Sequence, residues 1–162
     1  MQDQLLEYQE LALGSRLKRL SEQLMKDVSK IYESLHIDFD PYHMPIFKLI
    51  SEQDELTIGE ISDLLLVTQP AVTQYINILS KKGLVISKTG KIDKRKKKVS
   101  LSVKGERMLN ILYPVWTVID QEMKIITHNV KNKTLLDHIQ YVENELTIEM
   151  FSSRVLSKIN TK

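Results

Sequence analysis

Apolar residues recur at helical spacing over the first 36 residues. They stand three, four or seven positions apart with no proline among them, as on one face of an amphipathic helix: Leu6, Leu13, Leu17, Leu20, Leu24, Val28, Ile31 and Leu35. This pattern predicts one long helix over residues 3–36. The segment 36–41, HIDFDP, ends the repeat. A second helix is predicted over about 42–52, with Pro45 in its first turn, where a missing N–H costs little.

Two short helices with a tight turn between them are predicted next. The first covers residues 57–66, where Thr57 and Glu60 have the spacing of a capping box; its expected buried face is Ile58, Ile61, Leu64 and Leu65. The second begins at the cap Thr68, has Pro70 in its first turn and ends at Gly83, a suitable left-handed residue. Its expected buried stripe is Val72, Ile76 and Leu79, with Tyr75 at the margin.

The rest of the chain predicts a hairpin and two more helices. Residues 84–88 and 98–101 have strand-like apolar residues, Leu84, Ile86, Val99 and Leu101, on either side of a charged tip. Ser102 is expected to cap a helix from 103 to about 129, bent or interrupted at Pro114. A final helix is predicted over about 133–159. The fold class is therefore mostly α with one small β-hairpin.

Two short helices followed by a hairpin fit a winged helix-turn-helix. The second helix is narrow enough to lie in a DNA major groove, and the residues expected at its DNA-facing side are Thr68, Gln69, Pro70, Thr73, Gln74 and Asn77. Gln and Asn bond bidentately to adenine, and Thr offers its hydroxyl to a base or phosphate and its methyl to thymine. No arginine lies on this face, which favours an A·T-leaning site. The alternative is an ordinary polar helix face.

Positive charge is concentrated in the segment Lys81 to Lys98. It holds nine basic residues and one acid, so its charge is +8, whereas the other 14 basic and 20 acidic residues give −6. This asymmetry predicts one localised anion-binding site, because lysines on a hairpin can displace counterions from a duplex. The candidate contacts of the wing are Lys88, Lys91, Asp93, Lys94, Arg95, Lys96 and Lys97. The alternative is a merely solvated loop.

Composition argues against other classes of protein. The 162 residues include no cysteine, and the four histidines lack partners at ligand spacing, so neither a metal nor another cofactor is expected. No Gly-rich phosphate loop, nucleophile elbow or triad is found, which predicts a protein that is not an enzyme. No apolar run approaches the roughly 18–20 residues of a membrane span, and the start, MQDQLLEYQE, does not look like a signal peptide. We therefore expect a cytoplasmic protein.

The segments TQPAVTQYINILSKKGLV and KIDKRKKKVSLSVKGERML resemble the recognition helix and wing of the MarR family of bacterial transcriptional regulators. The family's Asp-x-Arg corresponds to Asp93-Lys94-Arg95. The resemblance implies that Arg95 enters the minor groove and that Asp93 orients it through an ion pair. The family's Leu-Thr-x-x-Gly appears as residues 101–105, LSVKG, in which serine can cap the helix as threonine does.

A narrower resemblance concerns the segment LALGSRLKRLSEQLMKDVSKIYESLHIDFDPYHMPIFKLIS and the later FSSRVLSKI. Both are similar to the regulator half of proteins that fuse a MarR domain to an N-acetyltransferase. We expect a stand-alone relative without the acetyltransferase. An alternative function follows: a winged-helix module that docks onto a partner enzyme, such as a separate acetyltransferase.

The terminal helices have more apolar residues than a small core requires. The last helix carries Leu135, Leu136, Ile139, Val142, Leu146, Met150 and Leu156. We expect one domain over 1–162, with dimerisation helices at 1–36 and 130–162, a DNA-binding core at 42–102 and a connecting helix at 103–129. The resemblance implies that the terminal helices interlock two subunits, and a homodimer suits a pseudo-palindromic duplex.

The resemblance also implies a small-molecule effector that changes the spacing of the two wings. Four residues are candidates to line its pocket: Tyr42, His43, Tyr113 and Trp116. The alternative for these four is aromatic packing at helix junctions.

Overall fold

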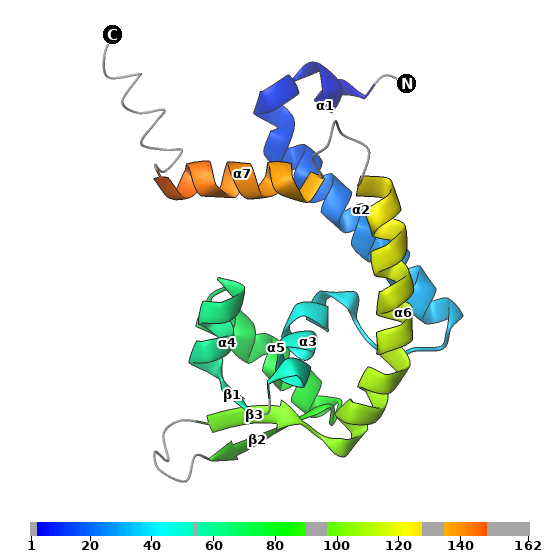
Figure 1. Cartoon of the computed structure of the whole chain (residues 1–162), viewed down its shortest axis with the longest axis vertical. Coiled ribbons are helices and arrows are strands. Elements are labelled where there is room, and N and C mark those ends of the chain that lie inside the picture. The colour runs from blue at the N-terminus through cyan, green and yellow to red at the C-terminus, as the bar shows by residue number, and fades with distance from the viewer. Residues whose placement is uncertain (1–2, 54, 90–96, 128–134, 149–162) are drawn as a thin grey trace. The chain divides into compact units, whose positions relative to one another are not determined.

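Helices make up most of the chain, with one small sheet (Figure 1). The computed structural model describes residues 3–53, 55–89, 97–127 and 135–148. In chain order the elements are α1 (Gln4–Glu7), the 3-10 helix η1 (Gln9–Ala12), α2 (Leu13–Ser34), the 3-10 helix η2 (Pro41–His43), α3 (Met44–Glu52), β1 (Leu56–Thr57), α4 (Ile58–Leu65), α5 (Gln69–Lys81), β2 (Val85–Thr89), β3 (Lys97–Leu101), α6 (Val103–Thr127) and α7 (Leu135–Ile148).

The prediction of one helix over 3–36 is wrong at its start. The backbone of Gln9 has a φ of 46°, in the left-handed region, and α1 and η1 precede α2 as separate turns. The break falls between Leu6 and Leu13, where the apolar repeat skips a turn and Ala12 is the one buried residue. Asp3 accepts from both terminal nitrogens of Arg19, at 3.0 and 2.6 Å, and so ties α1 to α2.

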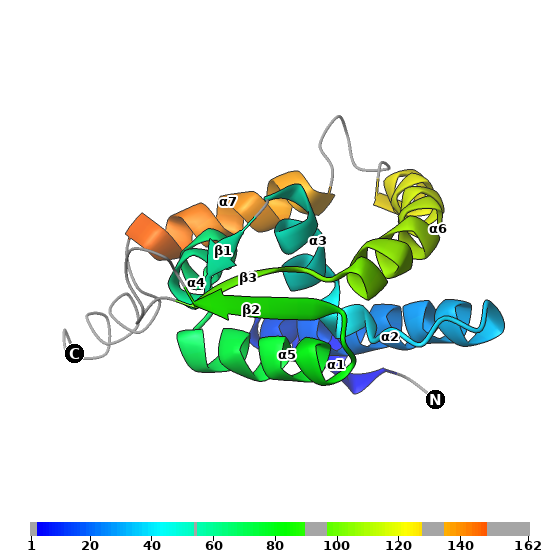
Figure 2. The same cartoon turned by 90° about the horizontal axis from the view of Figure 1, so that it is seen from below.

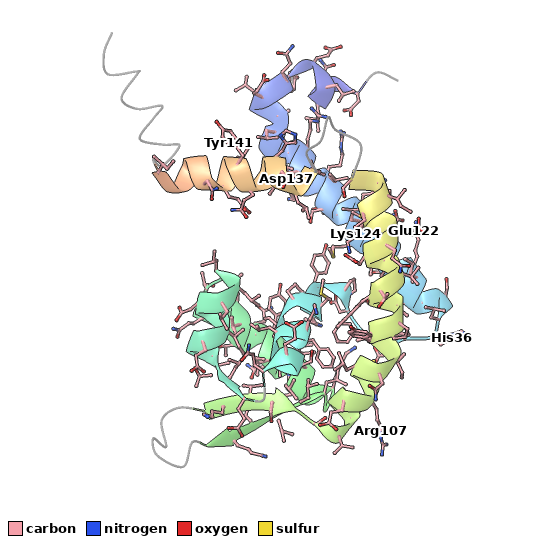
Figure 3. All side chains as sticks on the ribbon, viewed as in Figure 1. His36, Arg107, Glu122, Lys124, Asp137 and Tyr141 are labelled. Atoms are coloured by element: carbon pink, nitrogen blue, oxygen red, sulfur yellow. The ribbon has the colours of Figure 1, made fainter. Side chains whose placement is uncertain are left out.

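The predicted end of the long helix is confirmed. His36 has a φ of 56°, and Figure 3 shows it at the turn after α2. The amide of His36 donates to the carbonyl of Glu33 at 3.0 Å and that of Ile37 to Tyr32 at 2.8 Å. This is the hydrogen-bond pattern of a Schellman motif. Behind it the buried Tyr32 packs edge-on against Phe39, with ring centroids 6.2 Å apart.

The helices α3, α4 and α5 pack with an antiparallel sheet in the order β1-β3-β2 (Figure 2). β3 pairs with both neighbours: Val99 lies opposite Leu56 of β1 and opposite Ser87 of β2. The short strand β1 is not among the predicted elements, since two residues are too few to show alternation. The shared core consists of Ile46, Phe47, Ile50, Leu56, Ile61, Val72, Ile76, Leu79, Leu84, Val85 and Val99.

The buried faces are confirmed for α5 and partly wrong elsewhere. Val72, Ile76 and Leu79 are all buried as predicted. Leu64 of α4, however, is 58% exposed, and Ile86 of β2 is 40% exposed. Strand side chains alternate between faces, and it is Val85, not Ile86, that lies on the same face as Val99.

The connection from the sheet to α6 is built on a close backbone approach. The Ser102 hydroxyl accepts from the amide of Gly105 at 2.9 Å, as predicted for the cap, and donates to the carbonyl of Gly83 at 2.6 Å. The amide of Ser102 donates to the carbonyl of Leu84 at 3.0 Å. A Cβ on Gly105 would lie 2.0 Å from that same carbonyl oxygen, so this position requires glycine.

The chain divides into two compact units, residues 1–109 and 110–162. α6 continues through Pro114 without interruption, and α7 covers only the first part of the helix predicted over 133–159. Its predicted continuation lies outside the described residues. Among the described helices, none is long and apolar enough to cross a membrane.

Candidate nucleic-acid interface

The turn between α4 and α5 is held by hydrogen bonds at both of its ends. α4 begins with the predicted capping box, in which Thr57 accepts from the Glu60 amide and Glu60 accepts from the Thr57 amide. The buried Ser62 donates from its hydroxyl to the carbonyl of Val67 at 2.6 Å. Thr68 caps α5 by accepting from the amide of Ala71. These bonds orient the start of α5 relative to α4.

The outer side of α5 forms an open depression. Five of the six residues predicted for this helix line it, together with two that the sequence analysis did not select, and the full set is Gln69, Pro70, Thr73, Gln74, Asn77, Ile78 and Lys81. Thr68 does not line it. The two missed residues continue the four-residue spacing of the predicted ones, Ile78 after Gln74 and Lys81 after Asn77, and this spacing was the signal that could have found them.

The polar side chains of this face differ in their hydrogen bonds. The hydroxyl of Thr73 donates to the carbonyl of Gln69, one turn earlier, at 2.9 Å. The amide nitrogen of Gln69 lies beside α4, 3.8 Å from where a Cβ on Gly59 would stand. Gln74 and Asn77 are exposed, and within the described part of the chain their side chains have no hydrogen-bond partner.

The wing places like charges opposite each other. Lys88 of β2 lies directly across from Lys98 of β3, an arrangement that destabilises an antiparallel pair. Lys98 has an ion pair with Glu55 at 3.2 Å, whereas exposed Lys88 has none among the described residues. Lys91, Asp93, Lys94, Arg95 and Lys96 lie outside the described residues, as does the side chain of Lys97.

Lys82, at the end of α5, is engaged within the protein. Its ammonium group lies 2.7 Å from the carboxylate of Asp38, and its carbonyl accepts from the ammonium of Lys104 at 2.8 Å. The bond from Lys82, together with the positive charge of Lys82 and Lys104, lowers the pKa of Asp38. Lys81, by contrast, borders the open depression.

The four candidate effector residues fall into two environments. Tyr42 borders a cavity of about 400 Å³, which Tyr32, Phe39, Asp38, Asp40 and Lys82 also line. His43 does not line it. Tyr113 and Trp116 belong to the second unit, and the effector pocket stays a prediction.

His43 is buried in an aromatic cluster. It is 3% exposed and packs edge-on against Phe39 and Tyr75, with ring centroids 6.2 and 5.2 Å away. Its Nδ1 has no hydrogen-bond partner among the described atoms. Burial lowers the pKa of His43, the charge of Asp40 opposes this and that of Lys82 adds to it. These contacts match the aromatic-packing alternative at this position.

Comparison with known proteins relates this geometry to one family. Residues 43–97, less than half of the chain, match the model of the MarR family. No curated protein matches the chain.

Several solved structures share the fold. The S. aureus MepR–DNA complex has a TM-score of 0.66 and 16% identity, over 87% of this chain and 96% of that one. A mutant MarR from E. coli complexed with operator DNA has a TM-score of 0.64 and 21% identity, over 90% and 99%. The transcriptional regulator BldR from Sulfolobus solfataricus has a TM-score of 0.60 and 19% identity, over 92% and 100%. At these identities the likeness shows the fold.

Proposed function

We propose that this chain, whose residues 43–97 match the MarR family, is a transcriptional regulator that binds double-stranded DNA sequence-specifically as a homodimer. Two of the proteins that share its fold were solved with DNA. The observation that carries the proposal is the outer face of α5, where two free amides, a threonine and a proline share one open surface. An exposed helix of this kind fits a major groove.

The base of the wing supports contact with the DNA backbone. Lys88 and Lys98 repel each other across the strands, and phosphate groups would relieve that repulsion. We assign the other charged wing residues, residues 91–97, to the same role, with Arg95 in the minor groove and Asp93 orienting it. In this arrangement α5 reads base edges and the hairpin holds phosphates and the neighbouring minor groove.

A homodimer accounts for the apolar surface of α2. Leu13, Leu17, Leu20, Ile31 and Leu35 are all exposed in the single chain, and exposed apolar surface of this extent marks an interaction site. A second copy covers such a surface while placing two α5 helices on one duplex. A two-fold dimer reads a pseudo-palindrome, with half-sites one helical turn apart or a multiple of it.

The remaining parts of the proposal concern regulation, chemistry and location. An effector that favours one spacing of the two wings would shift the population of binding-competent dimers. We infer that the chain acts without catalysis and works in the cytoplasm, in contact with the chromosome. BldR, which shares this fold, is a transcriptional regulator, and no observation on the described residues favours docking onto a partner enzyme.

The deciding experiment is a binding selection from random duplexes, followed by affinity measurements at ~150 mM salt. We expect a palindromic winner that binds ~10³-fold or more tightly than scrambled DNA. Uniformly weak binding to all sequences would contradict the proposal, since a basic hairpin alone gives salt-dependent but unselective binding.

Arg95→Ala tests the wing on the selected duplex. We expect a loss of roughly 1–3 kcal/mol, typical of an arginine that contacts DNA in a groove. Arg107→Ala is the matched control, because it removes the same charge from an exposed residue of α6 (Figure 3). β3 runs from Lys97 to Leu101 and then leads into α6, so Arg107 lies beyond the end of the sheet away from the hairpin tip. Equal losses of affinity in both variants would show that Arg95 acts only through its charge and would contradict its role in the minor groove.

A further inference from the structure

The hydroxyl of Thr73 is already used inside α5. It donates its one hydrogen to the carbonyl of Gln69 at 2.9 Å, and the residue is exposed on the face that carries the depression. A threonine hydroxyl has a single O–H to donate. In this rotamer Thr73 has no hydrogen left for a base acceptor or a phosphate oxygen. To make such a contact, it would have to give up a bond that it already has.

The methyl group of Thr73 is exposed on the same face and is free to contact a base. In the major groove, thymine alone presents a methyl group, on C5, and an aliphatic side chain reads it by apolar contact. The residues one turn away on the same stripe are Pro70 and Asn77, and Ile78 borders the same depression. The surface around Thr73 therefore offers apolar carbon atoms together with the free amides of Asn77 and Gln74.

Gln69 is placed differently from the other two amides. Its nitrogen lies beside the first turn of α4, near Gly59 and Thr57, so it sits at the edge of the depression towards α4. The centre of the face is left to Thr73, Gln74 and Asn77. Of these three, Thr73 alone has its polar group bonded within the helix.

We propose that Thr73 is a specificity-determining residue that selects a thymine in each half-site through its methyl group, and that its hydroxyl donates no hydrogen bond to DNA. The inference rests on the proposed function, because it needs α5 in a major groove. It divides the face into a methyl reader, Thr73, and two amide readers, Gln74 and Asn77, which suit adenine.

Two substitutions separate the methyl from the hydroxyl. Thr73→Val keeps the methyl and the branched shape but removes the hydroxyl, whereas Thr73→Ser keeps the hydroxyl and removes the methyl. We expect Thr73→Val to bind the duplex selected by the wild-type protein within about twofold. Thr73→Ser is expected to lose about fourfold for each half-site, or about fifteenfold for two, the value of one buried methyl group. Thermal unfolding of each variant checks that it is folded.

The complementary experiment removes the methyl group from the DNA. Deoxyuridine lacks only the C5 methyl of thymidine, so each thymine of the selected duplex is replaced by uracil in turn. The wild type and Thr73→Val are expected to lose affinity at one position per half-site, and Thr73→Ser is expected to lose nothing further at that position. Such non-additivity identifies the two methyl groups as contact partners.

The outcomes separate this inference from the proposed function. If the wild type selects a duplex but Thr73→Val binds it weakly and Thr73→Ser binds it normally, the hydroxyl is the reader and the inference fails alone. The inference also fails alone if no uracil substitution distinguishes Thr73→Ser from the wild type. If the wild type selects no duplex, both the proposed function and the inference fail.

Discussion

At the scale of single residues, two glycines of the first unit, residues 1–109, have opposite surroundings. A Cβ on Gly105 would lie 2.0 Å from the carbonyl oxygen of Leu84, which already accepts the amide of Ser102. A Cβ on Gly59 would lie no closer than 3.8 Å to its neighbours, an ordinary contact distance. The same substitution therefore has opposite effects at the two positions.

Gly105→Ala is expected to lower the free energy of unfolding by about 1–3 kcal/mol, because backbone atoms must move to admit the methyl group. Gly59→Ala is the control and is expected to raise it by about 0.5 kcal/mol, since alanine restricts the unfolded chain. Denaturant unfolding measures both. A neutral Gly105→Ala would show that α6 does not approach Leu84 so closely.

Sequence analysis identifies one of these two glycines through its motif, but it cannot tell which of the two tolerates a side chain. Gly105 belongs to the segment LSVKG, which marks a helix start. That a carbonyl from the other side of the hairpin occupies the place of its Cβ follows only from how α6 packs against residue 84.

At the scale of elements, three helices end on a residue in the left-handed region. They are α2 at His36, α4 at Leu66 and α5 at Gly83, with φ of 56°, 54° and 71°. Only the third has glycine, so only there does the residue type itself indicate the left-handed conformation. The end of α4 is the helix-turn-helix turn itself, where Leu66 is 92% exposed and contributes no burial.

Leu66→Gly is expected to stabilise the protein. A non-glycine residue in the left-handed region costs roughly 1–2 kcal/mol, and the entropy of a new glycine offsets about 0.5–1 kcal/mol of this. The net gain is about 0.5–1 kcal/mol in the free energy of unfolding, read from chemical denaturation.

Leu66→Ala is the control for this gain, because it removes the exposed side chain but keeps the Cβ. It is expected to change stability by no more than a few tenths of a kcal/mol, as is usual for an exposed site. Equal gains from alanine and glycine would trace the effect to the exposed leucine side chain and not to the backbone.

At the scale of the whole molecule, the exposed apolar stripe of α2 is the surface that we propose as the dimer interface. Leu17 and Leu20 are 45% and 43% exposed, although their spacing on the helix is that of a buried face. The sequence predicts this stripe for a long helix, and its exposure in the single chain fits an interface better than a core.

Leu17→Glu combined with Leu20→Glu is expected to convert the homodimer to a monomer, because two carboxylates would have to be buried unpaired. Sedimentation at micromolar concentration measures this, and the monomer is expected to bind the selected duplex far more weakly. Lys18→Glu, on the exposed side of the same helix, is expected to stay dimeric. A dimer that survives the double substitution would place the interface elsewhere.

The sequence by itself determined what depends on local chemistry. Capping residues, a proline in a first turn and apolar spacing are read within a few positions, so Thr57 with Glu60, Thr68 with Pro70, and the stripe Val72, Ile76 and Leu79 were predicted correctly. The helix-turn-helix follows from these, and the hairpin follows from the strand-like segments 84–88 and 98–101 around the basic residues. Together they define the fold class.

The tertiary structure alone decided what depends on contacts between distant residues. The strand β1 exists because Leu56 pairs with Val99, 43 positions away. Gly105 is required because residue 84 lies against it, and Lys82 points to Asp38 rather than outward. The bond from Thr73 to Gln69 is local, yet the sequence left several roles open for that hydroxyl. Which partner a side chain takes depends on the atoms around it, and only the folded chain brings those atoms together.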